Sequence, residues 1–133
     1  MEKYIRGKTI VPEVVSFGFK HDLPEDLDLL FDVRFLPNPY YDENLKEFSG
    51  KDKRVSDYVL DNDEGKEFLA KLLDILMFML PLFEKKGREK TTIGIGCTGG
   101  KHRSVAVAEY VGSFLKNKNY QSKIIHRDLE KEL

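Results

Sequence analysis

The chain has 133 residues, 41% hydrophobic and 34% charged, which predicts one domain over residues 1–133 with a single core. Its 22 basic and 23 acidic residues give a formal net charge of −1, which excludes a global attraction to nucleic acid and leaves any polyanion contact to a local patch. The single cysteine excludes an internal disulfide, and since no signal peptide is visible, we expect the chain to reside in the cytoplasm.

The N-terminal part predicts two strands followed by irregular chain. Residues 14–20 and 29–35 are rich in valine, leucine and phenylalanine, and Pro24 marks a turn between them. Two prolines then interrupt the pattern, because each disfavours helix in the residue before it. We therefore expect irregular structure over 36–52, and loops of that length are often functional.

Two helices are predicted next, a short one at 55–60 and a longer one at 64–83 with its cap within 61–63. The longer helix carries two apolar stripes: Leu69, Leu72, Leu73, Leu76, Leu80 and Phe83, and separately Phe68, Ile75, Phe78 and Leu82. We expect it to be covered on two sides, and Pro81 to bend or end it. Its apolar run, 72–83, is shorter than the roughly 20 residues of a membrane-spanning helix.

The C-terminal part predicts a strand, a glycine-rich turn, a helix and a last strand. Residues 92–95 alternate as a buried strand does, 105–118 have helical spacing, and 123–127 form the final strand. Strands separated by helices predict an α/β fold with a mainly parallel sheet flanked by helices. In such sheets, ligands bind beyond the carboxyl ends of the strands.

The turn at 96–104 is the strongest candidate for a ligand site. Gly99 and Gly100 allow close approach of the backbone, and unpaired N–H groups at a helix start carry partial positive charge. Basic and polar side chains of the same turn supply further donors, which favours an anion-binding site for a phosphate or sulfate. We expect its ligands to come from Cys97, Thr98, Gly99, Gly100, Lys101, His102, Arg103 and Ser104.

Two other strand ends could contribute to the same crevice. Lys20 and Arg34 each lie near the end of a predicted strand, as Cys97 does, so three distant segments are expected to converge there. Asp32 and Arg34 lie two apart on a strand and could simply pair with each other. Tyr40 and Tyr41 are assigned to core or loop packing, with stacking on a base or sugar as the alternative.

The spacing Cys-x5-Arg-Ser also fits the phosphate-binding loop of cysteine-dependent tyrosine phosphatases. In that alternative Cys97 would be the nucleophile and Arg103 would hold the phosphoryl oxygens. The histidine that usually precedes the cysteine is Gly96 here, and the nearest candidate for the general acid is Asp32, to which we assign a buried structural role. We therefore expect no catalysis, and neither a metal nor another cofactor.

A second resemblance covers most of the chain. Four blocks in order, 16–21, 31–39, 95–104 and 126–129, resemble the C-terminal domain of the RapZ family of RNase adapter proteins, with its core at about 14–129. The resemblance implies a domain that binds small regulatory RNA and glucosamine-6-phosphate and presents the RNA to an endoribonuclease. The ligand residues it implies are His21, Cys97, Thr98, Gly99, His102 and Arg103, together with Lys20, Arg34 and Asn38.

The chain departs from the family pattern at both ends. Full-length members carry an N-terminal nucleotide-binding domain, and nothing here matches its loop, so we expect either a cut domain or a solitary one. The basic tail of the enterobacterial members is also missing, since this chain ends Glu130-Lys131-Glu132-Leu133. Candidates for RNA contact are therefore Lys116, Lys118, Lys123 and Arg127, with Lys101, Arg103 and the 85–90 turn.

We interpret the chain as a sensing or RNA-adapter domain without catalysis of its own. The expected partners are a phosphorylated sugar or another small phosphate, a small RNA, an endoribonuclease and further copies of the chain, with no membrane. A pure interaction domain that self-associates through the 64–83 helix is the third alternative.

Overall fold

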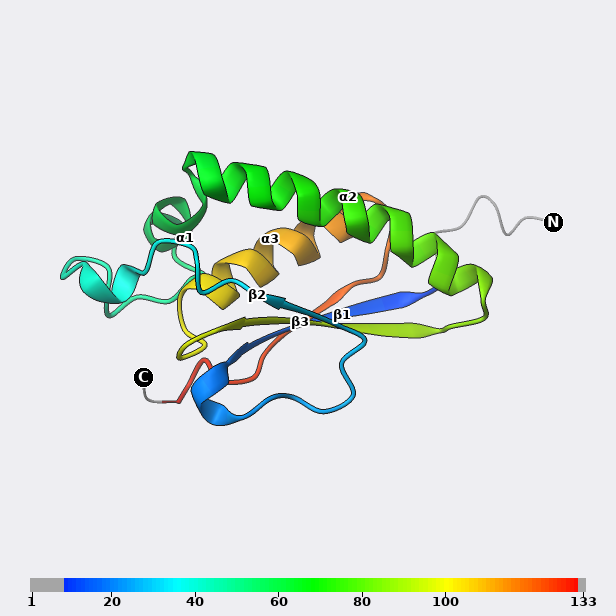
Figure 1. Ribbon diagram of the computed structural model, residues 1–133, viewed down its shortest axis with the longest axis horizontal. Coiled ribbons are helices and arrows are strands. Elements are labelled where there is room, and N and C mark those ends of the chain that lie inside the picture. Colours follow the sequence, from blue (N-terminus) through cyan, green and yellow to red (C-terminus); the bar gives the residue numbers. More distant parts are fainter. Residues whose placement is uncertain (1–8, 132–133) are drawn as a thin grey trace.

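In the described part of the chain, four parallel strands form the sheet on which the other elements are arranged. They are β1 (Val11–Gly18), β2 (Leu29–Asp32), β3 (Lys90–Cys97) and β4 (Lys123–His126), in the order β2-β3-β1-β4. The computed structural model describes residues 9–131 (Figure 1). Because every strand pair is parallel, all four carboxyl ends lie at the same edge of the sheet.

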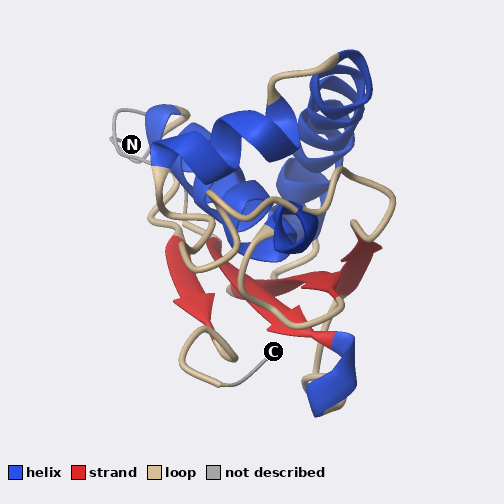
Figure 2. Ribbon diagram, turned by 90° about the vertical axis from the view of Figure 1, so that its left-hand side faces the viewer, coloured by secondary structure: helices blue, strands red, loops and turns tan. Residues whose placement is uncertain are grey.

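Helices cover one face of this sheet. They are α1 (Lys53–Leu60), α2 (Asp63–Lys85) and α3 (Arg103–Asn117), and the connection from β1 to β2 passes over the opposite face (Figures 1 and 2). Two short 3₁₀ helices, Phe19–His21 and Pro39–Tyr41, follow β1 and β2. The predicted α/β fold, with a mainly parallel sheet flanked by helices, is confirmed.

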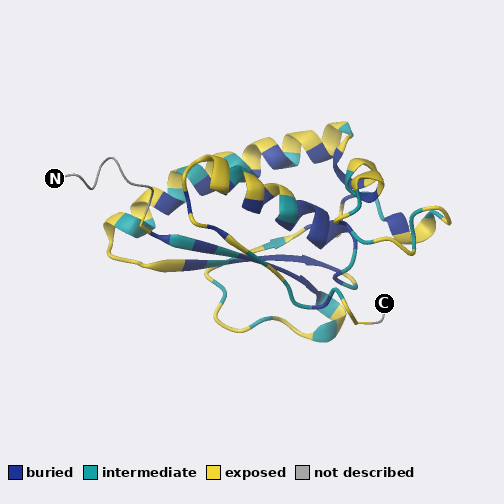
Figure 3. Ribbon diagram, turned by 180° about the vertical axis from the view of Figure 1, so that it is seen from behind, coloured by how far each residue is buried: buried dark blue, intermediate teal, exposed yellow. Residues whose placement is uncertain are grey.

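The core lies between the sheet and the helices. Val14 on β1 pairs with Ile93 on β3, and both side chains are fully buried beneath α3. Because α3 lies between the sheet and the other helices, much of its length is buried (Figure 3). Leu72, Leu76 and Leu80 of α2 complete the core above it.

The strand register sets the position of the glycine-rich turn. The last residues of β1 and β3, Gly18 and Cys97, lie opposite each other, and Asp32 at the end of β2 lies opposite Gly96. The turn after Cys97 therefore begins where three strands end together.

Both N-terminal strands end earlier than predicted, and β1 also begins earlier, at Val11. β1 ends at Gly18, whose N–H donates to the Asp128 carboxylate at 2.8 Å, and the chain continues as a 3₁₀ helix. β2 ends at Asp32, whose carboxylate accepts the N–H of Arg34 at 3.0 Å. A side chain that captures a nearby main-chain donor competes with strand pairing, which turns the chain out of the sheet.

Helix α2 differs from the prediction in two ways. It continues past Pro81 to Lys85, and the N–H of Lys86 closes its last turn, so the prediction that the proline could end the helix is wrong. Its second stripe is not covered within the described part of the chain, since the side chain of Phe78 is 65% exposed and Ile75 and Leu82 are also exposed. Phe68 alone of that stripe is half-buried, in an edge-to-face contact with Phe35.

Asp128 connects the C-terminal segment to the end of β1 through hydrogen bonds. Its buried carboxylate accepts hydrogen bonds from the Gly18 N–H and the Arg127 guanidinium and pairs with Lys131. Burial would raise the pKa of Asp128, but these hydrogen bonds outweigh burial and hold the pKa well below its ordinary value. The ionised carboxylate is therefore the form that stabilises the fold.

This contact predicts a pH-dependent stability. Because the pKa of Asp128 is lower in the folded state, its contribution is complete above the unfolded value of about 3.9 and is lost as the pH falls below it. We expect Asp128→Asn to lower the free energy of unfolding by about 2 kcal/mol at pH 7. Urea titrations should show this difference shrinking below about pH 4, whereas a constant difference from pH 7 to pH 3 would contradict the assignment.

Candidate anion site at the carboxyl edge of the sheet

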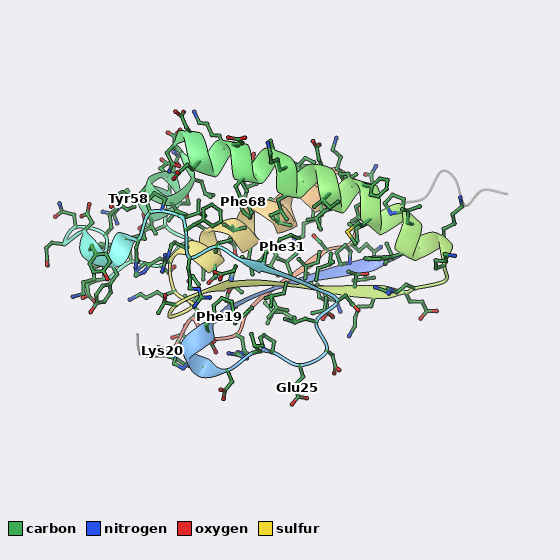
Figure 4. The ribbon with its side chains drawn as sticks, viewed as in Figure 1. Phe19, Lys20, Glu25, Phe31, Tyr58 and Phe68 are labelled. Atoms are coloured by element: carbon green, nitrogen blue, oxygen red, sulfur yellow. The ribbon has the colours of Figure 1, made fainter. Side chains whose placement is uncertain are left out.

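A cavity of about 230 Å³ opens at the carboxyl edge of the sheet. The turn after β3 forms one wall, and the segments that follow β1 and β2 form the others (Figure 1). Figure 4 shows Lys20 and Phe19 on the 3₁₀ helix after β1, beside this edge. The cavity is lined by Lys20, Asn38, Tyr40, Tyr41, Cys97, Thr98, Gly99, Lys101, His102 and Arg103.

The main-chain donors of the turn remain available. Among the hydrogen bonds between described residues, none uses a main-chain N–H of residues 98–105 as its donor. Helix α3 begins at Arg103, and the preceding residue, His102, makes no capping hydrogen bond with its side chain. The first N–H groups of a helix have no partner inside the helix, so this end of α3 attracts anions.

Arg103 is the best-placed cation of the cavity. The residue is only 5% exposed, and its Nη1 donates to the Arg34 carbonyl at 2.6 Å and weakly to the Leu36 carbonyl at 3.4 Å. Its Nη2 donates to Thr98 Oγ1 at 3.3 Å, and its buried Nε has no hydrogen-bond partner among the described residues. A buried donor without a partner is costly, and this donor belongs to a residue that lines the cavity.

His102 lines the cavity but anchors a neighbouring loop. Its Nε2 donates to the Lys46 carbonyl at 2.9 Å. Burial lowers the pKa of His102, and the nearby cations Lys101 and Arg103 lower it further despite the carbonyl contact. The imidazole is therefore neutral at pH 7, so the positive charge of the cavity comes from Lys20, Lys101 and Arg103.

Close backbone packing holds the turn in place. A Cβ added at Gly18 would lie 2.4 Å from the carbonyl carbon of Gly99, and one at Gly50 would lie 2.3 Å from the His102 oxygen. Gly100 has a φ of +82° and lies against the main chain of Gly18. The turn is thus held between the end of β1 and the loop before α1.

The structure brings eight of the twelve predicted ligand residues to the cavity. The four that do not line it are His21, Arg34, Gly100 and Ser104. Arg34 pairs with Asp32 and stacks on the Phe19 ring at 4.1 Å, so only its carbonyl takes part, by accepting from Arg103. His21 lies on the 3₁₀ helix after β1, where its carbonyl accepts from Arg127.

Gly100 and Ser104, the other two predicted ligands that do not line the cavity, have structural roles in the turn. Gly100 makes the close crossing with Gly18, and Ser104 is fully buried beneath the loop. The Sγ of Cys97 donates to Ser104 Oγ at 3.2 Å, and Cys97 is itself buried at the floor of the cavity.

Asp32, the candidate general acid of the phosphatase alternative, does not lie in the cavity. Asp32 is exposed rather than buried, which corrects the sequence prediction, and it does not line the cavity. Hydrogen bonds from the Arg34 side chain lower the pKa of Asp32, so it is ionised and has no proton to donate at neutral pH. No carboxylate is present among the described residues that line the cavity.

Tyr40 and Tyr41 line the cavity, whereas the sequence analysis assigned them to core or loop packing, with stacking as the alternative. Instead of packing in the core, they are 41% and 81% exposed and form one wall of the cavity. The available signal was their position directly after Pro37-Asn38-Pro39, because a rigid turn presents the following side chains outward.

The lysines predicted to contact RNA lie at the other edge of the sheet. Lys116 and Lys118 are at the C-terminal end of α3, and Lys123 begins β4, so all three are far along the fold from the turn at 98–103. Arg127 differs from them, because its guanidinium is bound by the Asp128 carboxylate and by two main-chain carbonyls of 21–22. Over the described residues, no helix is long and apolar enough to cross a membrane.

Comparison with known proteins gives the family. The RapZ C-terminal domain matches residues 10–130. A nucleotide-binding protein of Caldicellulosiruptor saccharolyticus is 52% identical over 126 residues, which cover 95% of this chain and 43% of that protein. The nucleotide-binding protein YvcJ of Bacillus subtilis is 51% identical over 126 residues, covering 95% and 42%, and a nucleotide-binding protein of Clostridium botulinum is 51% identical over 124 residues, covering 93% and 42%.

The chain thus spans less than half the length of these relatives. The family match, by contrast, extends from the start of β1 to beyond β4 and includes every wall of the cavity. The chain belongs to the RapZ C-terminal domain family.

Proposed function

We propose that this domain binds a phosphorylated amino sugar, of the glucosamine-6-phosphate kind, in the cavity at the carboxyl edge of the sheet. The observation that carries the proposal is the row of unpaired N–H groups at 98–105 beside the buried, partly unsatisfied Arg103. Main-chain donors and a guanidinium together match the oxygens of a phosphate dianion. Lys20 and Lys101 add positive charge at the rim.

Calorimetry with glucosamine-6-phosphate tests this proposal directly. We expect saturable binding that weakens with added inorganic phosphate, since both ligands would use the same donors. If the wild-type domain binds neither compound, the cavity is not a phosphate site.

We propose further that the domain is an RNA adapter that works without catalysis of its own. The family membership supports an adapter, and the absence of a carboxylate from the described lining residues argues against phosphoryl transfer. The Cys97 thiol at the cavity floor is the one observation that favours the phosphatase alternative. The partners of the proposed adapter would be a small RNA, an endoribonuclease and further copies of the chain, in the cytoplasm.

The RNA proposal predicts a change in salt dependence. Each phosphate neutralised on single-stranded RNA adds about 0.7 to the slope of log K against log salt. Changing Lys116, Lys118 and Lys123 together to glutamine should therefore reduce that slope by roughly 2 for a single-stranded RNA, measured by filter binding. The matched control changes Lys51, Lys53 and Lys66, which are exposed on the α1 side, and should leave the slope unchanged. Equal slopes for the two triple variants would rule out the proposed RNA surface.

A further inference from the structure

The cavity is larger than a phosphate requires. Its volume of about 230 Å³ corresponds to roughly eight water molecules at about 30 Å³ each, whereas a phosphate group has only five heavy atoms. The donors for an anion are concentrated on one side, at the turn before α3. The 38–41 segment contributes another part of the lining, which includes the aromatic residues Tyr40 and Tyr41.

This aromatic wall is held rigidly. Asn38 caps the 3₁₀ helix, because its side chain accepts the N–H of Tyr40 at 3.1 Å and its carbonyl accepts the N–H of Tyr41 at 3.2 Å. The two rings meet edge to face with centroids 5.5 Å apart. The ammonium of Lys46 lies 4.5 Å from the Tyr40 ring centroid, so one aromatic face is already occupied. Tyr41, which is 81% exposed, retains the more accessible ring.

The charges of the cavity limit how the rest of a ligand can be held. No carboxylate is found among the described lining residues, so the amine of an amino sugar has no ion-pair partner there. The Asn38 oxygen accepts from Tyr40, and Thr98 Oγ1 accepts from Arg103. Contact with an aromatic face is therefore a further means to hold a ring whose phosphate lies on the turn.

We propose that Tyr41 is a specificity-determining residue that stacks against the pyranose ring of the ligand while the 98–105 turn holds its phosphate. This inference rests on the proposed function, since it concerns the second half of the same ligand. Tyr40 is a positioning residue, because its ring contacts the Tyr41 ring edge to face while Lys46 lies against Tyr40 itself.

Titration of Tyr41 variants with two ligands tests this inference. We expect Tyr41→Ala to weaken glucosamine-6-phosphate binding roughly five- to tenfold and to leave inorganic phosphate binding unchanged. Tyr41→Phe keeps the ring and should bind both ligands within about twofold of wild type. Tyr58→Ala, which removes an exposed tyrosine of α1 outside the cavity, is the matched control and should have no effect.

The outcomes separate this inference from the proposed function. If wild type binds glucosamine-6-phosphate and Tyr41→Ala binds it equally well, the stacking role is wrong while the phosphate site stands. If wild type binds inorganic phosphate as tightly as the sugar phosphate, the ring adds nothing and the stacking role is again wrong. If wild type binds neither, both proposals fail.

Discussion

Replacing Arg103 by alanine should weaken glucosamine-6-phosphate binding by roughly 100-fold in calorimetry, the largest effect we expect on the cavity. The guanidinium lies buried at the start of α3 with an unpartnered Nε. Hydrogen bonds to charged groups contribute about 1.5–3 kcal/mol, and about 2.7 kcal/mol corresponds to 100-fold in affinity. The substitution also leaves the carbonyls of Arg34 and Leu36 without this donor, so part of the loss would come from the cavity wall.

Arg103→Lys and Cys97→Ser are the informative controls. Lysine keeps the positive charge but cannot make the forked contacts, so we expect it to recover only part of the affinity. Serine at position 97 keeps a small polar group at the cavity floor and should bind normally. Circular dichroism shows whether each variant is folded. Normal binding by a folded Arg103→Ala would contradict the anion site.

The same variants decide between sensing and catalysis. A phosphatase would release phenol from an aryl phosphate in a burst that disappears in Cys97→Ser. We expect no turnover by the wild-type domain, because the described lining residues offer no general acid. A burst that depends on Cys97 would show that the domain is an enzyme.

Gly18→Ala should be the most destabilising of the substitutions considered, lowering the free energy of unfolding by about 3 kcal/mol. A methyl group there would lie 2.4 Å from the Gly99 carbonyl carbon and 2.8 Å from the Gly100 nitrogen. Both neighbours are backbone and cannot rotate away, so the turn must move away from β1. Because that turn carries the anion donors, phosphate binding should weaken together with stability.

Gly87→Ala is the matched control for this substitution. Gly87 has a φ of +90°, but nothing lies within 4 Å of an added Cβ. We therefore expect Gly87→Ala to lower the free energy of unfolding by about 1 kcal/mol, through backbone conformation alone, and to leave phosphate binding unchanged. Urea unfolding of the two variants measures the difference. If Gly18→Ala costs no more than Gly87→Ala, the close crossing of β1 and the turn is not a constraint.

The turn between β3 and α3 and the fold class were predictable from sequence because their signals are local. Strand, turn and helix follow one another within 92–118, so glycine flexibility and helix-end charge act among neighbours in the chain. The parallel arrangement followed from strands separated by helices. The strand ends could not be placed as well, because side-chain capture by Asp32 and Asp128 decides where β2 and β1 stop.

Contacts that residue type alone does not reveal decided the rest of the site, some of them local and others between distant segments. Arg34 and His21 have the residue types of ligands, but Arg34 is occupied by Asp32 and His21 lies outside the cavity wall. Tyr40 and Tyr41 have the residue type of core residues, yet the Pro-Asn-Pro turn presents them to the cavity. Sequence by itself determined which chemistry the turn after β3 can perform, since that depends on adjacent residues. Only the tertiary structure decided which side chains surround it, since packing between segments more than 50 residues apart sets their direction.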